Sequence, residues 1–479
     1  MLLLGAFGAS LLASGADLPN VLLIMTDNHG AWSLGCYGNP DIRTPHIDRL
    51  ADEGTLLERV YSSNAVCSPT RATFLTGLMP SQHGVHRYLG AGGAQTGPQA
   101  FSTIAEFRTL PEILAGNGYV CGLSGKWHLG LNMEPQEGFT FWVTKPHGHT
   151  VEFYDQPVIE NGEIREEPTY QTDYWTKRGI EFIEQCARRE PRRPFFLFLA
   201  YNGPYGLGAS MLNPPRNRHA EVYAGAPLRS FPREEMHPWL HSTRNLLNQP
   251  AAMRRYAAET SGVDDGVGEV MGALKKHGLD ENTLVVFTAD QGLSGGHSGL
   301  WGMGDHTRPL TAFDGTMWIP MIFRHPGRIP AGRRSGILAS NYDFLPTLLD
   351  YLGLADELPA EPPQPGRSFL PVLQGKTMDW DNTVFYEFEN VRAIRTLDWK
   401  YIERIHEAPN ELYDLRNDPG ERHNLVADPK HTAVRDELRQ RLRTHFKRYA
   451  DPKWDLWNGG KSKTGLLTGK LFGLADPYR

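Results

Sequence analysis

The stretch NVLLIMTDNHG, residues 20–30, contains an apolar run from Val21 to Met25 that ends at Asp27 and Asn28. A continuous apolar run of this length, without alternating polar residues, is typical of a strand buried on both faces. Three further runs have the same form and end in polar residues: NTLVVFTADQG at Asp290 and Gln291, PFFLFLAYNGPYG at Asn202 and Tyr205, and YVCGLSGKWHLG at Lys126 and His128. The chain therefore contains several expected strands whose ends carry reactive or metal-binding side chains.

Helical patterns lie between these runs, for example TLPEILAGNG at residues 109–118 and YAAETSGVDDGVGEVMGALKKHG at residues 256–278. Strands that alternate with helices predict an α/β fold with a mostly parallel central sheet and helices on both faces. In such sheets ligands bind outside the carboxyl ends of the strands. One polar strand end is explained by the turn that follows it, but two separate pairs of an acid and an amide favour a site.

The composition restricts the classes of function. The chain has 479 residues, 40% of them hydrophobic, which is enough for a large core and more than one domain. The formal net charge of −6 and the pI of about 6.3 provide no basic footprint for nucleic acid. The four cysteines are too few for a disulfide scaffold, although a single bridge stays open: Cys36, Cys67, Cys121 and Cys186.

The two acid and amide pairs indicate a metal site. Asp27, Asn28, Asp290 and Gln291 offer two carboxylates and two amide oxygens, without His or Cys among them. Such hard oxygen donors suit Ca²⁺ or Mg²⁺ better than zinc. Because Ca²⁺ takes about 6–8 oxygen ligands, water, a bidentate carboxylate or a substrate oxygen would complete the shell.

One cysteine has a distinctive setting, in NAVCSPTRATFLTG at residues 64–77. Pro69 suits the first turn of a helix, so Cys67 is expected at a helix N-terminus, where backbone N–H groups favour an anion. Three interpretations compete: a buried structural cysteine, a thiolate nucleophile, and a cysteine that is converted into another group. Three residues separate Cys67 from Arg71, whereas the loop of Cys-based phosphatases separates its Cys and Arg by five.

The segment CSPTRATFLTG resembles the signature of the sulfatase family, Cys-x-Pro-x-Arg followed by Leu-Thr-Gly. Other segments resemble further parts of that family and together cover most of the chain: PNVLLIMTDNHG, GNPDIRTPHIDRLADEG, GKWHLG, TADQG, IPMIFRHPGRI and ELYDLRNDPGERHNL. The resemblance implies an alkaline-phosphatase-like α/β fold with a smaller C-terminal α+β domain. It also implies hydrolysis of aryl or carbohydrate sulfate esters through a formylglycine nucleophile made from Cys67.

The resemblance implies a role for each matching residue. The metal, Ca²⁺ or Mg²⁺, would be held by Asp27, Asn28, Asp290, Gln291 and modified Cys67. Arg71 would steady the formylglycine and the metal-site carboxylates, Lys126 would bind a sulfate oxygen, and His128 would be the base in sulfate release. Fixed cations and a metal stabilise the charge of a transferring sulfuryl group. Maturation would require a formylglycine-generating enzyme as a partner.

Three positions depart from the family pattern. Asn28 stands where the family commonly has a second Asp, which removes a negative charge but leaves a coordinating oxygen. Tyr205 stands where the family often has His, and a phenol with an ordinary pKa of about 10 is a poorer proton shuttle near neutral pH. Either Tyr205 binds substrate, or another residue supplies the proton. The family's second lysine is absent, and Arg308 is expected to bind substrate in its place, with Met303 and His306 as rivals.

Two histidines are interpreted as loop residues outside the site. They are His147 and His149, in KPHGHTVEFYDQ. On a strand, residues at i and i+2 would face the same way and could meet a metal or an acidic sugar.

The organisation along the chain is predicted as follows. Residues 1–16, MLLLGAFGASLLASGA, are similar to a secretory signal, which implies export to a periplasmic, extracellular or lysosome-like compartment. A catalytic domain is expected over residues 17–376, and a C-terminal domain with a short antiparallel sheet and a helix over residues 377–479. No other stretch is apolar enough to predict a membrane span. The segment after Asp451 either packs over the active-site mouth or is mobile.

Three functions compete at this point. The first is a sulfatase that acts on a small-molecule or carbohydrate sulfate ester. The second is a phosphonate monoester or phosphodiester hydrolase that uses the same site, because sulfate and phosphate esters have similar shapes. The third is a ligand-binding homologue without catalysis, which Tyr205 and the missing lysine would suit and the intact Cys-x-Pro-x-Arg motif opposes.

Overall fold

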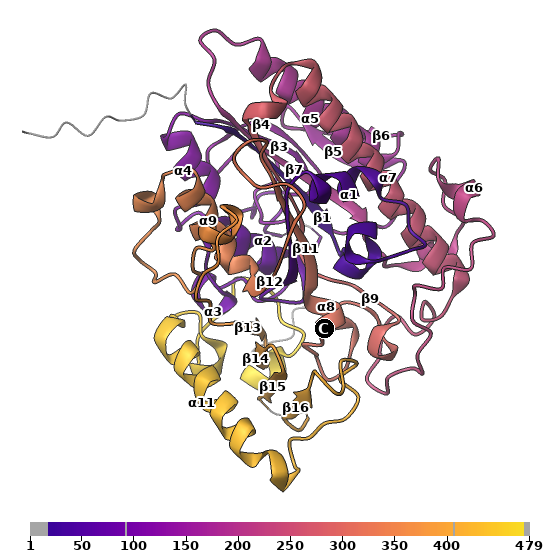
Figure 1. The fold of residues 1–479 in the computed structure, drawn as a ribbon, viewed down its shortest axis with the longest axis vertical. Helices are drawn as coiled ribbons and strands as arrows, with labels where there is room; N and C mark the ends of the chain where they lie inside the picture. Colours follow the sequence, from indigo (N-terminus) through magenta and orange to yellow (C-terminus); the bar gives the residue numbers. More distant parts are fainter. Residues whose placement is uncertain (1–17, 92, 406–407, 474–479) are drawn as a thin grey trace, which may run out of the picture.

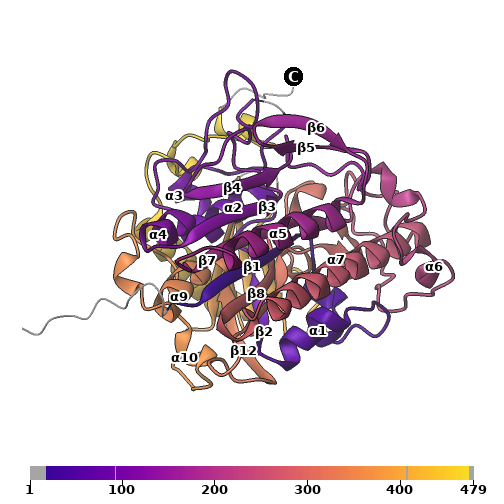
Figure 2. The ribbon, with the colours of Figure 1, turned by 90° about the horizontal axis from the view of Figure 1, so that it is seen from above.

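The computed structural model describes residues 18–91, 93–405 and 408–473. The predicted secretory signal therefore lies outside the described residues. In the described part, a large sheet is covered by helices on both faces, and a smaller sheet with one long helix lies at one end of it (Figures 1 and 2). This arrangement confirms the predicted fold class.

The large sheet has ten strands, and their order places the expected active-site strands next to one another. In spatial order they are β12 (Arg333–Ser340), β2 (Thr55–Tyr61), β11 (Trp318–Arg324), β8 (Thr283–Ala289), β1 (Asn20–Asp27), β7 (Phe195–Pro204), β3 (Val120–Gly125), β4 (Phe139–Thr144), β5 (Gln156–Glu160) and β6 (Glu163–Glu167). The strands from β8 to β4 are mutually parallel, whereas β11, β5 and β6 join the sheet through antiparallel pairings. The four carboxyl ends identified from the sequence thus meet at one edge.

The apolar run of β1 explains why helices cover both faces. Val21, Leu23 and Met25 belong to one core cluster, and Leu22 and Ile24 belong to another. Because successive side chains point to opposite faces of a strand, a fully apolar strand needs a cover on each side. One face is covered by α1 (Pro45–Asp52), α5 (Gln171–Ala187) and α7 (Pro250–Lys276), and the other by α2 (Cys67–Thr76), α4 (Leu110–Gly116), α9 (Phe344–Tyr351) and α10 (Leu370–Leu373).

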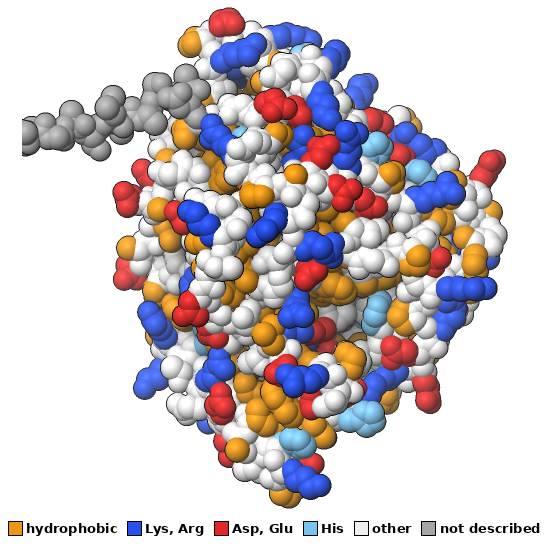
Figure 3. Space-filling view, viewed as in Figure 1, with side chains coloured by type: hydrophobic (Ala, Val, Ile, Leu, Met, Phe, Trp, Pro, Cys, Tyr) orange, Lys and Arg blue, Asp and Glu red, His pale blue; other side chains and the backbone are white. Residues whose placement is uncertain are grey.

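Short elements complete the main body. They are α3 (Pro80–His83), α6 (Ala220–Tyr223), α8 (Asp314–Met317) and a small ribbon of β9 (Ser294–Gly295) and β10 (Trp301–Gly302). On the face seen in Figure 3, acidic and basic side chains are interspersed. None of the described helices combines the length and the apolar character that crossing a membrane requires.

The C-terminal part forms a four-stranded antiparallel sheet of β13 (Thr383–Phe388), β14 (Val391–Thr396), β15 (Trp399–Arg404) and β16 (Glu411–Asp414). Helix α11 (Thr432–Tyr449) packs on β14 and β15 through Leu438, Leu442 and Phe446. The last strand of the large sheet ends at Ser340 and the first strand of the small sheet begins at Thr383. The domain division between residues 376 and 377 stays a prediction.

Candidate active site at the carboxyl edge of the large sheet

Three of the expected site residues have a left-handed backbone. Asn28 after β1, His128 after β3 and Tyr205 after β7 have φ values of 55°, 63° and 59°. Positive φ is unfavourable for residues with a Cβ, and such residues cluster at functional sites, where the surrounding structure holds them in place. In each case the sharp turn directs a polar side chain toward the same edge of the sheet.

Two carboxylates and one thiol form the centre of this edge. Asp27, Cys67 and Asp290 are buried, and their potential ligand atoms all lie within 4.8 Å of one another. Burial and the negative charge of Asp27 raise the pKa of Asp290 to about 6. Two buried carboxylates this close are stabilised by a cation between them.

The two amides complete the donor set. The Nδ2 atom of Asn28 donates to the carbonyl oxygen of Tyr205 at 2.9 Å, which leaves Asn28 Oδ1 directed toward the Gln291 amide. The Gln291 amide lies between Asn28 and the hydroxyl of Thr70, whose Oγ1 is 3.1 Å away. Thr70 Oγ1 is also within bonding distance of the carbonyls of Val66 and Cys67, at 2.9 and 2.8 Å.

The single proton of the Thr70 hydroxyl decides how the Gln291 amide is oriented. Because that proton is used on a backbone carbonyl, the hydroxyl can only accept from Gln291. In the structure Gln291 Oε1 lies at Thr70 and Nε2 at the centre, but a Thr70 hydroxyl that donates to a backbone carbonyl requires the amide rotated by 180°, with its nitrogen at Thr70 and its oxygen at the centre. With the Gln291 amide rotated, two carboxylates and two amide oxygens would face one point, and such a donor set fits a hard divalent cation.

Cys67 is the first residue of α2, and its Sγ atom lies 3.6 Å from Asp27 Oδ1. Burial, followed by the negative charge of Asp27, raises the pKa of the Cys67 thiol to about 12. A thiolate nucleophile needs the opposite shift. Among the three interpretations of this cysteine, the surroundings therefore disfavour the thiolate.

Arg71 holds the centre together one turn further along α2. Its Nε donates to Asp290 Oδ2 at 3.0 Å, and its Nη2 lies 3.5 Å from Asp27 Oδ2. Its Nη1 donates to the backbone oxygen of Lys126 at 2.6 Å. The side chain is fully buried, so one guanidinium aligns both carboxylates and the loop after β3 by charge-assisted hydrogen bonds.

Lys126 supplies a second buried cation at the centre. Its ammonium contacts Asp27 Oδ2 and lies 5.6 Å from the centre of the Tyr205 ring. Its burial opposes the charged form, but the neighbouring Asp27 more than compensates and raises the pKa of Lys126. Lys126 is therefore a fixed positive charge beside Cys67.

His128 is held in one tautomer. Its Nε2 lies 2.9 Å from the carbonyl oxygen of Leu89, so Nε2 carries the hydrogen, and the buried Nδ1 has no hydrogen-bond partner among the described residues. A Cβ atom added to Gly148 would lie 2.1 Å from the imidazole, so this glycine permits the close contact. Burial and the charge of Lys126 lower the pKa of His128 well below its usual value. The Nδ1 lone pair is thus free to accept a proton.

The C-terminal segment braces this side of the site. Lys463 N donates to Gly84 O at 2.8 Å, and Arg87 N donates to Thr464 Oγ1 at 3.1 Å. Residues 84–87 lead into Leu89, whose N–H donates to Ser68 Oγ at 3.0 Å. The segment after Asp451 therefore packs against the loop that holds His128.

Tyr205 and the loop after β4 correct one interpretation of the sequence. His149 is not a remote loop residue, because its ring lies 5.8 Å from the His128 ring and its Nδ1 lies 3.5 Å from Tyr205 Oη. The loop begins at Lys145, directly after β4, which pairs in parallel with β3. A fifth parallel strand therefore ends at the site, in addition to the four that the apolar runs indicated.

Of the two side chains expected near the position of the missing lysine, Met303 lies at the centre and Arg308 does not. Met303 Sδ lies 3.3 Å from the Gln291 amide, whereas Arg308 is exposed and its Nη1 donates to the carbonyls of Asp305 and Thr307, both at 2.7 Å. The structure does not bring the Arg308 guanidinium to the centre, and its assignment as a substrate ligand stays a prediction. His306 pairs with Asp305, with 2.8 Å between Nδ1 and Oδ1.

The sequence matches two protein-family models and is similar to proteins of known function. The family model described as Sulfatase matches residues 19–354, and the model described as N-sulphoglucosamine sulphohydrolase, C-terminal, matches residues 306–448. An N-acetylglucosamine-6-O-sulfatase of Bacteroides thetaiotaomicron is 28% identical and aligns with 90% of this chain and 87% of its own. The N-acetylgalactosamine-6-sulfatase of Canis lupus familiaris is 31% identical, over 80% of this chain and 72% of its own.

A solved structure is similar over nearly the whole chain. It is described as a complex with its substrate D-glucosamine-2-N,6-O-disulfate. Its TM-score is 0.70 at 26% identity, and the alignment covers 90% of this chain and 98% of that one.

Proposed function

The chain belongs to the sulfatase family and is a sulfuric ester hydrolase, and on this premise we propose that its substrate is a sulfate ester of a sugar, cleaved at the site around Cys67. The observation that carries the proposal is the convergence of Cys67 with two carboxylates and two buried cations. A sulfuryl group in transfer spreads negative charge over its oxygens, and preorganised cations stabilise that charge.

We propose that Cys67 is the precursor of formylglycine, made by a formylglycine-generating enzyme. Hydrated formylglycine would supply one hydroxyl to attack sulfur and a second hydroxyl whose deprotonation releases sulfate. The motif supports this, because Cys67, Pro69 and Arg71 stand in the family's spacing at the start of α2. The raised pKa of the thiol leaves an unmodified Cys67 poorly suited to nucleophilic attack.

The metal in this proposal is Ca²⁺, with Mg²⁺ as the alternative. Asp27, Asn28, Asp290, Gln291 and modified residue 67 would hold it, and it would supply Lewis acidity at the sulfate. Arg71 keeps both carboxylates oriented toward one point, so their positions do not depend on the ion alone.

Two side chains of the protein act on the sulfate itself in this proposal. Lys126 Nζ, held beside Asp27, donates to a sulfate oxygen. His128 accepts a proton on Nδ1, because its Nε2 is committed to Leu89. An imidazole placed in this way is suited to removing the proton whose loss releases sulfate.

The sugar class follows from the relatives. The bacterial relative is named for a 6-O-sulfate of N-acetylglucosamine and the canine relative for a 6-sulfate of N-acetylgalactosamine. We propose that this chain also acts on a 6-O-sulfated N-acetylhexosamine, and that it does so in an exported compartment. The sequence of residues 1–16 supports export.

The test combines a mass measurement with an activity measurement. The protein is expressed in a host with a formylglycine-generating enzyme, and the peptide that contains residues 64–71 is weighed. Conversion of the thiol to an aldehyde removes about 18 Da. Sulfate release is then measured from 6-O-sulfo-N-acetylglucosamine with Ca²⁺ present, beside the matched phosphate ester.

Each outcome separates the competing functions. The proposal expects the aldehyde mass and faster turnover of the sulfate ester than of the phosphate ester. Faster turnover of the phosphate ester would favour a phosphoryl substrate. Binding without turnover by protein of verified aldehyde mass would identify a homologue that does not catalyse. An unmodified thiol in a competent host would refute the formylglycine route.

A further inference from the structure

The alcohol that leaves a sugar sulfate must be protonated, because a sugar alkoxide is a poor leaving group. Tyr205 directly follows β7, the strand beside β3, and its ring centre lies 5.6 Å from Nζ of Lys126, which directly follows β3. The Tyr205 ring is buried, and a phenol has an ordinary pKa of about 10. The phenol alone is therefore a weak proton donor, and a second group has to supply the proton.

His149 lies at the position from which it could supply that proton. Its Nδ1 is 3.5 Å from Tyr205 Oη, and its imidazole ring lies 5.8 Å from that of His128. The side chain is half-buried, at the edge of the site, whereas Lys126 and His128 lie deeper. On the outer side the Tyr88 ring meets the His149 ring edge-on at 4.9 Å.

The loop that carries His149 is held by buried polar contacts. Lys145 Nζ donates to the backbone oxygen of His149 at 2.9 Å and to Thr150 Oγ1 at 3.3 Å. Asn202 on β7 donates to the same Thr150 hydroxyl at 3.2 Å, and Asn132 donates to the backbone oxygen of Lys145 at 3.0 Å. A side chain on a loop fixed in this way is preorganised for a task at the site.

We propose that Tyr205 and His149 form a proton relay that protonates the leaving alcohol, an inference that rests on the proposed function. Tyr205 is the catalytic residue that touches the leaving oxygen, and His149 acts through it. In this arrangement the imidazole contributed by the loop after β4 compensates for the phenol at the end of β7.

The step balances as follows. A hydroxyl oxygen of modified residue 67 bonds to sulfur while the bond between sulfur and the leaving oxygen breaks, and the electron pair of the broken bond stays on the leaving oxygen. The Tyr205 hydroxyl proton moves to the oxygen, and the phenol regains a proton from Nδ1 of protonated His149. His149 ends as neutral imidazole and is reprotonated from solvent.

The charges around His149 depend on the substrate. In the ligand-free protein burial, followed by the positive charges of Lys126, His147 and Lys145, lowers the pKa of His149 to about 4. A sulfate monoester brings a negative charge next to Lys126 and so opposes this shift. Substrate binding is therefore expected to raise the pKa of His149.

The test compares two leaving groups in the enzyme with verified formylglycine. 4-Nitrophenyl sulfate releases a stabilised phenolate that needs no proton, whereas 6-O-sulfo-N-acetylglucosamine releases an alcohol that does. His149→Gln is expected to lower kcat/KM for the sugar sulfate by about 100-fold and for the nitrophenyl ester by less than about threefold, because general acid catalysis matters only for the poor leaving group. Tyr205→Phe should show the same pattern, and the double variant should lose little more than either single one.

The matched control is His147→Gln, two residues away in the same loop, which should leave both substrates within about twofold. In His149→Ala, added imidazole should restore part of the sugar sulfate activity, which a purely structural role would not allow. Equal losses on both substrates, or no loss on either, would overturn the relay. If the wild-type enzyme cleaves neither sulfate ester, the proposed function fails instead, so the two failures are distinguishable.

Discussion

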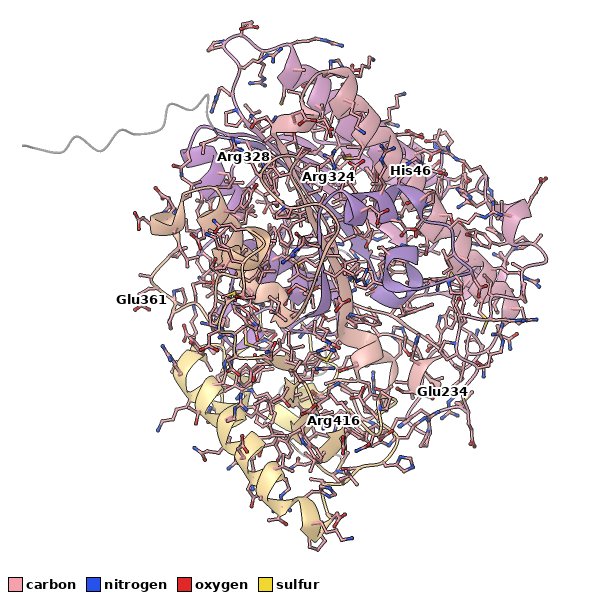
Figure 4. All side chains as sticks on the ribbon, viewed as in Figure 1. His46, Glu234, Arg324, Arg328, Glu361 and Arg416 are labelled. Atoms are coloured by element: carbon pink, nitrogen blue, oxygen red, sulfur yellow. The ribbon has the colours of Figure 1, made fainter. Side chains whose placement is uncertain are left out.

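The two edges of the large sheet use buried charge in different ways. At the amino edge of β8, Arg324 donates from Nη1 and Nη2 to Asp280 at 2.9 and 3.1 Å, and from Nε to Glu53 at 2.8 Å. Figure 4 shows Arg324 and Arg328 in the upper part of the molecule. Arg416 is labelled in the lower part, near the C-terminal sheet. These charges pair with one another and line a cavity of about 930 Å³.

The carboxyl edge leaves selected atoms available instead. His128 Nδ1 has no hydrogen-bond partner in the described part of the chain, and Asp27 and Asp290 face each other around a point that a cation would fill. The two edges also differ in which residues adopt a positive φ. Turns at the amino edge take positive φ at Gly327, whereas the carboxyl edge takes it at His128 and other reactive residues. Charges that only satisfy one another stabilise the fold, whereas buried polar atoms that keep a free lone pair prepare a site.

The largest expected effect tests whether the carboxyl edge is specialised for catalysis. Cys67→Ala should lower turnover of any sulfate ester by at least about 10⁴-fold, because the proposed nucleophile is lost. Sulfate release measures the activity, and thermal melting checks the fold. Cys186→Ala, a buried cysteine on α5, is the control and should keep full activity. Turnover by Cys67→Ala close to the wild-type rate would contradict the assigned nucleophile.

Removal of the metal should affect both activity and stability. A chelator is expected to abolish turnover and to lower the melting temperature, because an ion at about 100 times its Kd contributes about 2.7 kcal/mol to folding. Added Ca²⁺ should restore both quantities. An unchanged melting temperature together with full activity would show that the paired carboxylates do not hold an ion.

A smaller effect is expected where the backbone approaches His128. In Gly148→Ala the new Cβ would lie 2.1 Å from the imidazole, so the ring must move and kcat should fall by about 100-fold. Gly272→Ala on α7 is the control, because its Cβ would meet nothing within 4 Å. That control should keep full activity and gain up to about 1 kcal/mol of stability. Similar activity of the two variants would argue against a catalytic role of His128.

The amino edge should respond in stability and not in activity. Arg324→Met leaves Asp280 without its partner and should lower the free energy of unfolding by about 2–4 kcal/mol, with kcat unchanged. Arg49→Met is the control, because Arg49 is exposed and also contacts Glu53, at 2.6 Å. A surface pair of this kind contributes about 0–1 kcal/mol. Denaturant unfolding measures the free energy of unfolding of both variants. A change in kcat of Arg324→Met would contradict the prediction that the amino edge serves stability and not activity.

The smallest effect is expected at Arg308. Its guanidinium is exposed and bonded to nearby carbonyls, so Arg308→Ala should change KM by less than about threefold. Initial rates on the sugar sulfate measure this. A tenfold rise in KM would instead support the role in substrate binding that the sequence predicts.

Much of this site was predictable because its signals are local. The apolar run before Asp27 and the run before Asp290 each mark a buried strand and its end, and parallel strands bring such ends to one edge. The short motif from Cys67 to Arg71 contains both the helix start and the cation. These local signals therefore predicted the fold class and a candidate metal site, and the family resemblance predicted a modified Cys67, without any coordinates.

Tertiary structure alone decided which residues surround that centre. Strand β4 is short and lies beside β3 only through sheet pairing, so no local pattern places Lys145 or His149 at the site. Whether Met303 or Arg308 faces Gln291 depends on the path of a loop, and a gap in an alignment does not determine that path. The sequence by itself determined the groups that lie in short motifs, such as the segment from Cys67 to Arg71 and the acid and amide pairs at the strand ends. Contacts between distant segments determined the rest, because their geometry depends on packing and not on spacing.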